Sequence, residues 1–296
     1  MRITVIGGRG QVARALAEQA RPGLDVVLLG RPTIDLEVTS NIASCIAWTR
    51  PDVIVNAAAY TNVESAESEA DKAYRINATG AGAVAAAAAR LRVPLVHLST
   101  EYVFDGSKAA PYTEADPPAP LNVYGRSKLE GEEAVASATP DYAILRTSWL
   151  YGPYGQNFVA KIRNLASTQS EIDVVSDRSG APTSVLDLAV GIEQVARNLL
   201  DYGCGSRGRG IFHMTCAGET SWAEFATRIL YLFSNGDTPR TVVRPIHSSC
   251  LRELARRPAN SRLDNGRLNA IHGISLPDWR EALSHVAKRM EKPPPA

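Results

Sequence analysis

The stretch Met1-Arg2-Ile3-Thr4-Val5-Ile6-Gly7-Gly8-Arg9-Gly10-Gln11-Val12-Ala13 begins the chain and decides its fold. Its apolar run at 3–6 predicts a short buried strand. The residues that follow, 11–20, predict a helix. Gly7 and Gly10 stand between the two with the spacing G-x-x-G-x-x-A. The chain therefore begins with a strand, a tight glycine turn and a helix.

The same alternation continues through the first half of the chain. Residues 26–29, 53–55 and 95–98 predict further short strands, and the alanine-rich stretch 66–91 predicts a long helix. Apolar strands separated by helices are typical of a parallel sheet that is covered on both faces. We therefore predict an α/β fold with a doubly wound parallel sheet, a Rossmann fold.

The second half of the chain alternates less regularly. Residues 142–146 and 172–175 predict strands, and residues 221–233 predict a helix capped by Ser221 or Thr220. We expect residues 1–150 to form a dinucleotide-binding domain whose sheet is completed by later segments. Residues 151–296 are expected to form mainly a smaller substrate-binding lobe, interleaved with the sheet.

The glycine turn has a chemical use beyond its shape. Gly7 permits the tight turn, and Gly10 lets the backbone approach a pyrophosphate at the start of the helix. A purely structural turn is the alternative reading. The second predicted strand ends at Arg31, where NAD-selective folds usually carry an acidic residue that binds the ribose. Arg31 is suited to the 2′-phosphate of NADP, so NADPH is the expected cofactor and NADH a possible one; a solvent-exposed loop arginine is the alternative.

Composition narrows the classes of partner. The 296 residues are 45% apolar and 21% charged, with a net charge of +1, so no overall field recruits nucleic acid or a membrane. The start of the chain is too short an apolar run for a signal peptide or a membrane span.

The histidines show no ligand spacing, so no metal is expected. Widely spaced thiols favour a reducing compartment and a cytoplasmic location. The four cysteines are Cys45, Cys204, Cys216 and Cys250.

Three further residues suggest acid catalysis. Tyr124 and Lys128 are four apart, so on a helix they share one face, and an ammonium beside a phenol lowers its pKa. Such a phenol suits a general acid. The apolar run at 95–98 continues into a strand that ends in the hydroxyls of Ser99 and Thr100, at the edge where α/β sheets bind ligands. The alternatives are surface chemistry for the tyrosine and lysine, and turn capping for the threonine.

Several motifs along nearly the whole chain carry a resemblance to a known family. They are Gly10-Gln11-Val12, Val55-Asn56-Ala57-Ala58-Ala59-Tyr60-Thr61, Ile76-Asn77-Ala78, Ser99-Thr100-Glu101-Tyr102-Val103-Phe104-Asp105-Gly106, Pro120-Leu121-Asn122-Val123-Tyr124-Gly125, Arg146-Thr147-Ser148-Trp149-Leu150-Tyr151-Gly152, Asn157-Phe158, Gly180-Ala181-Pro182-Thr183, Arg257-Pro258-Ala259-Asn260-Ser261-Arg262-Leu263 and Leu276-Pro277-Asp278-Trp279. With them the sequence resembles the dTDP-4-dehydrorhamnose reductase family, within the extended short-chain dehydrogenases.

The resemblance implies hydride transfer from NAD(P)H to C4 of a nucleotide-linked 4-keto-6-deoxysugar, most of all dTDP-4-dehydro-β-L-rhamnose. It implies a catalytic triad of Thr100, Tyr124 and Lys128. Residues expected to bind the cofactor are Gly7, Gly10, Gln11, Val12, Arg31, Asp35, Leu36, Ala57, Ala58, Ala59, Tyr60, Tyr124 and Lys128. Residues expected to bind the substrate are Thr100, Glu101, Trp149, Arg257 and Arg262.

Some of these assignments compete with plainer ones. Trp149 follows a strand and could be core packing as well as a sugar contact. Arg257 and Arg262 could form a solvated basic patch as well as a diphosphate site. Glu101 stands where the family usually has aspartate, which leaves sugar specificity open.

Two other functions remain open at this point. One is a nucleotide-sugar epimerase or dehydratase on the same fold. A dehydratase of this type usually carries Asp-Glu after the threonine, whereas Tyr102 follows Glu101 here. The other is a non-catalytic NADP-binding regulatory subunit, against which the intact triad argues. A homodimer is possible, and the sequence does not decide the oligomeric state.

Overall fold

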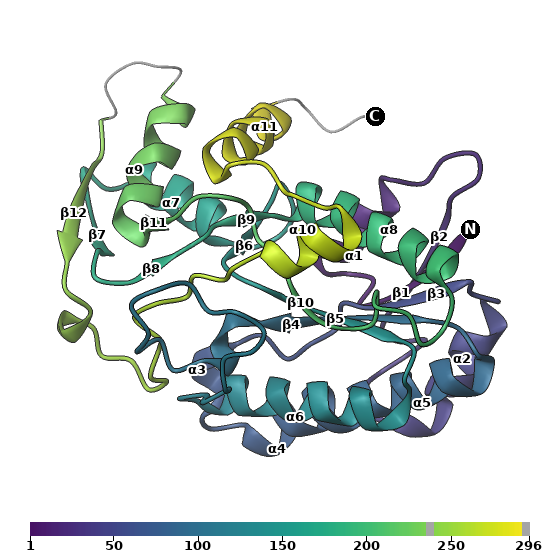
Figure 1. Ribbon diagram of the computed structural model, residues 1–296. Coiled ribbons are helices and arrows are strands. Elements are labelled where there is room, and N and C mark those ends of the chain that lie inside the picture. The colour runs from purple at the N-terminus through teal and green to yellow at the C-terminus, as the bar shows by residue number, and fades with distance from the viewer. Residues whose placement is uncertain (235–239, 292–296) are drawn as a thin grey trace.

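The computed structural model describes residues 1–234 and 240–291. At its centre lies a six-stranded sheet in the order β10-β5-β4-β3-β1-β2, in which every neighbouring pair is parallel (Figure 1). The predicted doubly wound parallel sheet is confirmed. The strands are β1 (Arg2–Ile6), β2 (Asp25–Leu29), β3 (Val53–Asn56), β4 (Leu95–Thr100), β5 (Tyr142–Thr147) and β10 (Gly210–His213).

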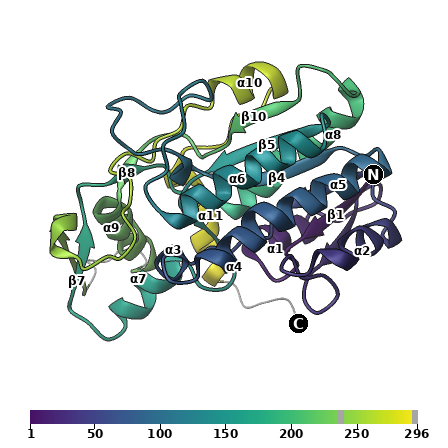
Figure 2. The ribbon, with the colours of Figure 1, turned by 90° about the horizontal axis from the view of Figure 1, so that it is seen from below.

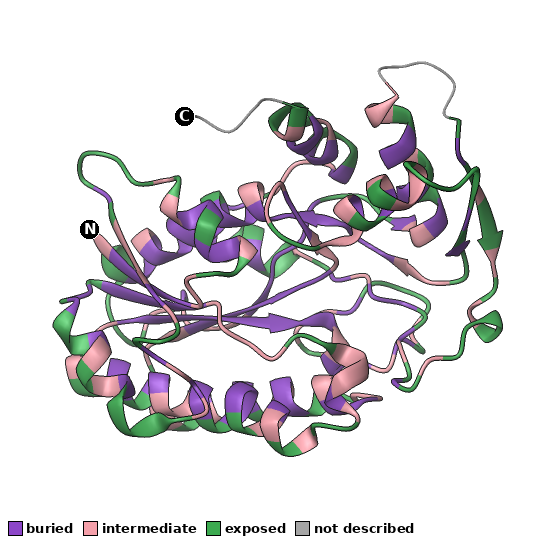
Figure 3. Cartoon of the chain, turned by 180° about the vertical axis from the view of Figure 1, so that it is seen from behind, coloured by how far each residue is buried: buried purple, intermediate pink, exposed green. Residues whose placement is uncertain are grey.

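Helices cover both faces of this sheet (Figures 1 and 2). On one face lie α2 (Ile42–Trp48), α5 (Ala81–Leu91) and α6 (Val123–Ala138). On the other face lie α1 (Gln11–Ala17), α8 (Val185–Tyr202) and α10 (Gly266–His272). Every residue of β3 and β4 is buried, and Figure 3 shows buried residues along the middle of the sheet. Strands buried on both faces need continuous apolar runs, which is the pattern seen in the sequence.

A second group of elements packs beside the sheet around its own apolar core. This core joins Tyr151, Phe225 and Trp279, which come from distant parts of the chain. The elements are α7 (Phe158–Ala166), α9 (Trp222–Phe233), α11 (Trp279–Glu291) and the parallel pair β7 (Glu171–Val175) and β12 (Val242–Ile246). Two short pairs connect them to the sheet: β6 (Leu150–Tyr151) with β9 (Thr183–Ser184), and β8 (Ser179–Gly180) with β11 (Thr220–Ser221).

The second half of the chain also contributes to the sheet itself. β10 pairs with β5, with Gly210 opposite Ala143 and His213 opposite Arg146. A later segment therefore extends the sheet that the first half begins. The division at residue 150 into a dinucleotide-binding domain and a substrate-binding lobe stays a prediction.

The long helix predicted for 66–91 is interrupted. The structure has α3 (Val63–Ala66), α4 (Ala70–Tyr74) and a π-helical segment (Arg75–Gly80) before α5. Asn77 in the π-helical segment accepts a hydrogen bond from the Tyr60 amide and donates one to the Tyr60 carbonyl. The helix deviates because this buried side chain binds a loop, which helical periodicity alone does not reveal.

Two smaller differences concern the end of one helix and the presence of another. α1 ends at Ala17, three residues before the predicted end, and α2 was not predicted. The predicted helix at 221–233 is confirmed as α9. Ser221 caps it in a reciprocal arrangement with Glu224. Within residues 1–234 and 240–291, no helix is both long and apolar enough to cross a membrane.

Candidate functional site

The glycine turn after β1 brings three segments together. The amides of Gly7 and Gly8 both donate to the carbonyl of Leu29 at the end of β2, over 2.9 Å each. Gly7 has φ of +107°, and a Cβ there would lie 2.9 Å from the Ala58 amide nitrogen. Only glycine combines this backbone angle with such a close approach. The turn therefore places the start of α1 against the segment that follows β3.

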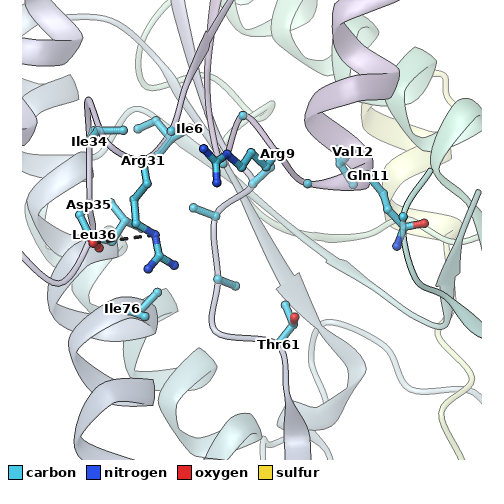
Figure 4. Close-up of a pocket in the computed structure, with 18 of the residues that line it drawn as sticks. Ile6, Arg9, Gln11, Val12, Arg31, Ile34, Asp35, Leu36, Thr61 and Ile76 are labelled. Carbon is cyan, nitrogen blue, oxygen red and sulfur yellow. Dashed lines mark ion pairs between the residues drawn. The ribbon is translucent and has the colours of Figure 1, made fainter.

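A cavity of about 530 Å³ opens beyond the carboxyl ends of β1, β2 and β3 (Figure 4). Its size is in the range of small-molecule and cofactor sites. It lies where the strand order reverses, which is where open α/β sheets bind ligands. The predicted cofactor residues that line it are Gly7, Gly10, Gln11, Val12, Arg31, Asp35, Leu36, Ala57, Ala58 and Ala59.

Three predicted cofactor residues do not line this cavity. The Tyr60 hydroxyl donates to Glu69 over 2.9 Å, and its backbone is bound to Asn77. Tyr124 and Lys128 lie on α6, outside the residues that form the cavity wall. Their roles toward the cofactor stay predictions.

Arg31 lies on the cavity wall with a largely free charge. Its side chain is 65% exposed, and its Nε lies 3.8 Å from a carboxylate oxygen of Asp35, the ion pair drawn in Figure 4. A pair this long and exposed contributes little stability. The guanidinium is therefore available to a phosphate. Arg9, a second cation on the wall, was not predicted, although its place inside the glycine turn was a usable signal.

The far end of the cavity is formed by residues that sequence reasoning missed. Leu150, Gly155 and Gln156 line it. The Asn157 side chain next to them donates to Gln11 Oε1, at the start of α1, over 2.9 Å. This contact joins residues far apart in the chain, so no local sequence pattern predicts it.

Thr100 and Tyr124 meet at the carboxyl end of β4. Asn122 caps α6 by accepting a hydrogen bond from the Gly125 amide over 2.8 Å, which fixes Tyr124 in the first helical turn. A Cβ on Gly125 would overlap the carbonyl oxygen of Tyr102, so this glycine allows the helix to approach the strand end. The Thr100 hydroxyl is close enough to the Tyr124 phenol to lower its pKa.

Lys128 lies one turn further along α6 and is buried. Its Nζ donates to the Leu98 carbonyl over 2.7 Å and lies 3.4 Å from His97 Nε2. Burial lowers the pKa of Lys128 to about 8, while the charge of Glu132 acts in the opposite direction. His97 was not predicted as a site residue; it is 1% exposed and faces the candidate catalytic lysine.

The expected effect of Lys128 on Tyr124 is not what this structure shows. Burial, followed by the charge of Glu101, raises the pKa of Tyr124, and the hydrogen bond with Thr100 only partly opposes this. The lysine ammonium points to the Leu98 carbonyl and is not among the groups that lower the pKa of Tyr124. The predicted lowering is therefore wrong for this arrangement, because desolvation of the phenol outweighs a charge that faces elsewhere.

Glu101 completes this group. It is 4% exposed and accepts a hydrogen bond from Thr100 Oγ1 over 2.8 Å. Burial raises its pKa to about 7, against the hydrogen bond from Thr100. A carboxyl, a hydroxyl and a phenol thus lie together, and they can hold or pass protons near neutral pH.

Trp149 follows β5 and has φ of +46°. Its indole stacks on that of Trp222, with ring centroids 3.7 Å apart and planes 15° apart. Trp149 is only partly buried, so it belongs neither to the sheet core nor to the fully exposed surface.

The two predicted diphosphate arginines are bound by protein groups. Arg257 Nη2 donates to Glu64 over 2.7 Å, and its Nε lies 3.2 Å from Glu253. Arg262 donates to Asn260 Oδ1 over 2.8 Å and to Glu219 over 2.7 Å. Their roles toward a diphosphate stay predictions. Among the residues that the structure describes, no group of three or more His, Cys, Asp or Glu side chains is arranged to hold a metal ion.

Comparison with known proteins agrees with this geometry. A family model described as RmlD substrate binding domain matches residues 1–292. A dTDP-4-dehydrorhamnose reductase of Sinorhizobium fredii is 49% identical over 95% of this chain and 95% of its own. The crystal structure of a dTDP-4-dehydrorhamnose reductase from Clostridium acetobutylicum superposes with a TM-score of 0.92 at 35% identity, over 99% of this chain and all of that one.

A third similar protein is known with a ligand. The dTDP-4-dehydrorhamnose reductase of Bacillus anthracis, solved in complex with NADP, superposes with a TM-score of 0.89 at 36% identity. The alignment covers 97% of this chain and 99% of that one. The glycine turn, the group at the end of β4 and these full-length similarities lead to one conclusion: the chain belongs to the dTDP-4-dehydrorhamnose reductase family of extended short-chain dehydrogenases.

Proposed function

We propose that this protein reduces C4 of dTDP-4-dehydro-β-L-rhamnose with NADPH and forms dTDP-L-rhamnose. The observation that carries the proposal is the group at the end of β4, in which Thr100 donates a hydrogen bond to Glu101 beside the phenol of Tyr124. The same molecule has a cavity of cofactor size that is lined by the glycine turn. The names of the similar proteins supply the substrate.

The cavity fits a dinucleotide. Gly7 leaves no room for a side chain against Ala58, and the α1 N-terminus carries no capping side chain, so its amides are open to an anion. Bound there, NADPH supplies the hydride. Arg31 and Arg9 on the wall favour a cofactor with an additional phosphate, and NADH remains the weaker alternative.

Tyr124 serves as the acid. Its raised pKa keeps the phenol protonated at neutral pH, so the proton is present when the C4 oxygen gains charge. When the sugar binds, the Thr100 hydroxyl turns from Glu101 to the same oxygen and orients it. The Lys128 ammonium faces the Leu98 carbonyl, so its proposed role is contact with the bound cofactor and not stabilisation of the phenolate. Positioned acid catalysis of this kind contributes roughly 10²–10⁴-fold.

The rival functions differ in what they need at this group. A dehydratase requires a second carboxylate after Glu101, but that position is Tyr102, whose ring meets Tyr124 edge-on with centroids 5.4 Å apart. A regulatory subunit needs no reacting groups, whereas here Thr100 and Glu101 are buried beside a half-buried Tyr124. The cytoplasmic location and the homodimer stay predictions.

The test is oxidation of NADPH by the purified protein with dTDP-4-dehydro-β-L-rhamnose. The expected result is sugar-dependent oxidation, with dTDP-L-rhamnose identified by NMR. Assays without sugar and with dTDP-glucose serve as controls. Epimerised or dehydrated sugar without NADPH consumption would assign the protein to a rival enzyme class, and binding of NADPH without any turnover would favour the regulatory subunit.

A further inference from the structure

Trp149 adopts a backbone conformation that a bulky residue avoids. Its φ of +46° lies in the left-handed region, where a side chain costs roughly 1–3 kcal/mol. Such a conformation persists only when the surroundings hold it. The contacts of Trp149 therefore show which residues hold its side chain in this conformation.

Trp222 holds one face of the Trp149 indole. The two rings are nearly parallel at 3.7 Å. Trp222 is the first residue of α9, whose N-terminus is capped reciprocally by Ser221 and Glu224. Its ring also packs on Phe158, with centroids 4.5 Å apart. Trp222 is thus a supported platform rather than a loose surface ring.

Gly180 approaches the same indole. A Cβ at Gly180 would lie 2.5 Å from Trp149 Cε2 and 2.9 Å from its Nε1, so any larger residue would displace the ring. Gly180 in β8 pairs with Thr220 in β11, directly before Trp222. Gly180 in this strand pair and Trp222, which follows it at the start of α9, therefore determine where the Trp149 indole lies.

Trp149 follows β5, the strand that pairs with β4 next to the reacting groups. Thr147 is the register partner of Thr100 in the sheet, and Trp149 follows two residues later. Within residues 1–234 and 240–291, the Trp149 Nε1–H has no hydrogen-bond acceptor. Indole nitrogen is a donor only, so an oxygen from a ligand is the partner that suits it.

We propose that Trp222 and Gly180 are positioning residues that hold the Trp149 indole so that its Nε1–H donates to an oxygen of the nucleotide-linked sugar. Neither residue touches the substrate; both act through Trp149. The inference rests on the proposed function, because it takes the sugar to bind beside Thr100. It adds two residues from the later half of the chain to the determinants of substrate affinity.

A double-mutant cycle tests this inference. The variants are Trp149→Phe, Trp222→Leu and the pair, with calorimetric titration of dTDP-L-rhamnose into the NADPH-bound protein and KM for the keto-sugar. Loss of one neutral hydrogen bond weakens affinity roughly 3- to 10-fold. We expect each single variant to show this loss and the pair to lose no more than Trp149→Phe alone. In Trp222→Leu, NADPH affinity and kcat are expected to change by less than roughly twofold.

Further variants separate positioning from general damage. Trp222→Phe keeps a ring in the stack and is expected to retain most of the affinity. Gly180→Ala disturbs Trp149 from the other contact and is expected to match Trp222→Leu, which keeps the test valid if Trp222→Leu does not fold. Trp48→Leu, at a side chain 81% exposed on α2, is the matched control. Stacked indoles are expected to give an exciton couplet in circular dichroism, which should vanish in Trp149→Phe and in Trp222→Leu.

Additive losses in the cycle, or a Trp222→Leu variant that behaves like Trp48→Leu, would overturn the inference while leaving the reductase intact. A wild-type protein that binds dTDP-L-rhamnose but does not oxidise NADPH with the keto-sugar would defeat the proposed function alone. A wild-type protein that does not bind dTDP-L-rhamnose would defeat both.

Discussion

The hydroxyl of Thr100 donates a hydrogen bond to the carboxylate of Glu101, its neighbour in the chain, over 2.8 Å. Both side chains are 4% exposed. Because burial raises the pKa of Glu101 to about 7, the carboxyl changes its charge near neutral pH, beside the hydroxyl that interacts with Tyr124. Ionised Glu101 opposes a phenolate at Tyr124, so the charge of one group limits the other.

Glu101 should make stability depend on pH. Its pKa rises from an ordinary value of 4.5 to about 7 in the folded chain, so the native state binds the proton more tightly than the unfolded state. The contribution is present below the unfolded pKa and is lost as pH rises through about 7. We expect Glu101→Gln to gain up to about 3 kcal/mol in unfolding free energy over the wild type at about pH 8 relative to about pH 5. Urea denaturation of both proteins measures this, and a gain that does not change with pH would contradict it.

Tyr124→Phe should lose turnover but keep the cofactor. Removal of the phenolic proton donor is expected to lower kcat roughly 10²–10⁴-fold, since positioned acid catalysis contributes that much. NADPH affinity, measured by fluorescence titration, should stay within roughly twofold, because this ring does not line the dinucleotide cavity. Tyr231→Phe, at a side chain 46% exposed on α9, is the control. Turnover like that of the wild type would remove Tyr124 from the role of acid.

Arg31→Ala should weaken NADPH selectively. Hydrogen bonds to charged groups contribute about 1.5–3 kcal/mol, so affinity for NADPH should fall roughly 10- to 100-fold while that for NADH hardly changes. KM for each cofactor measures this, with the exposed Arg90→Ala on α5 as the control. A strong preference for NADH that survives the substitution would exclude Arg31 as a phosphate-binding residue.

Arg146→Met should destabilise the fold. Arg146 Nη2 lies 2.6 Å from Glu132 on α6, and the two side chains are 2% and 3% exposed. Loss of one partner leaves a buried charge alone, which costs about 3–5 kcal/mol. The matched substitution Arg244→Met breaks an exposed pair with Asp173 and should cost less than about 1 kcal/mol. Thermal and urea unfolding compare the two, and equal losses would show that burial of the pair is unimportant.

Local sequence was sufficient for the framework. The apolar run and glycine turn at the start of the chain predicted β1 and the beginning of α1, because strand burial and backbone freedom at Gly7 are properties of neighbouring residues. The four-residue spacing of Tyr124 and Lys128 placed both on α6 for the same reason. The cap of α9 by Ser221 was also predicted from neighbouring residues.

Local sequence failed where a distant residue intervenes. The stretch 66–91 has helical composition throughout, yet Asn77 binds the backbone of Tyr60 and the helix becomes π-helical there. Gln156 at the cavity wall and His97 beside Lys128 were likewise not identified as site residues, because their neighbours come from other elements.

The sequence by itself determined the parallel α/β framework, the dinucleotide turn and the family, since each rests on short-range patterns in residue type. Only the tertiary structure decided the protonation behaviour of Glu101 and Tyr124, the direction in which the Lys128 ammonium points, and the contact of Trp149 with Trp222. Desolvation and ring stacking depend on which distant groups come together, and the folded chain alone sets that.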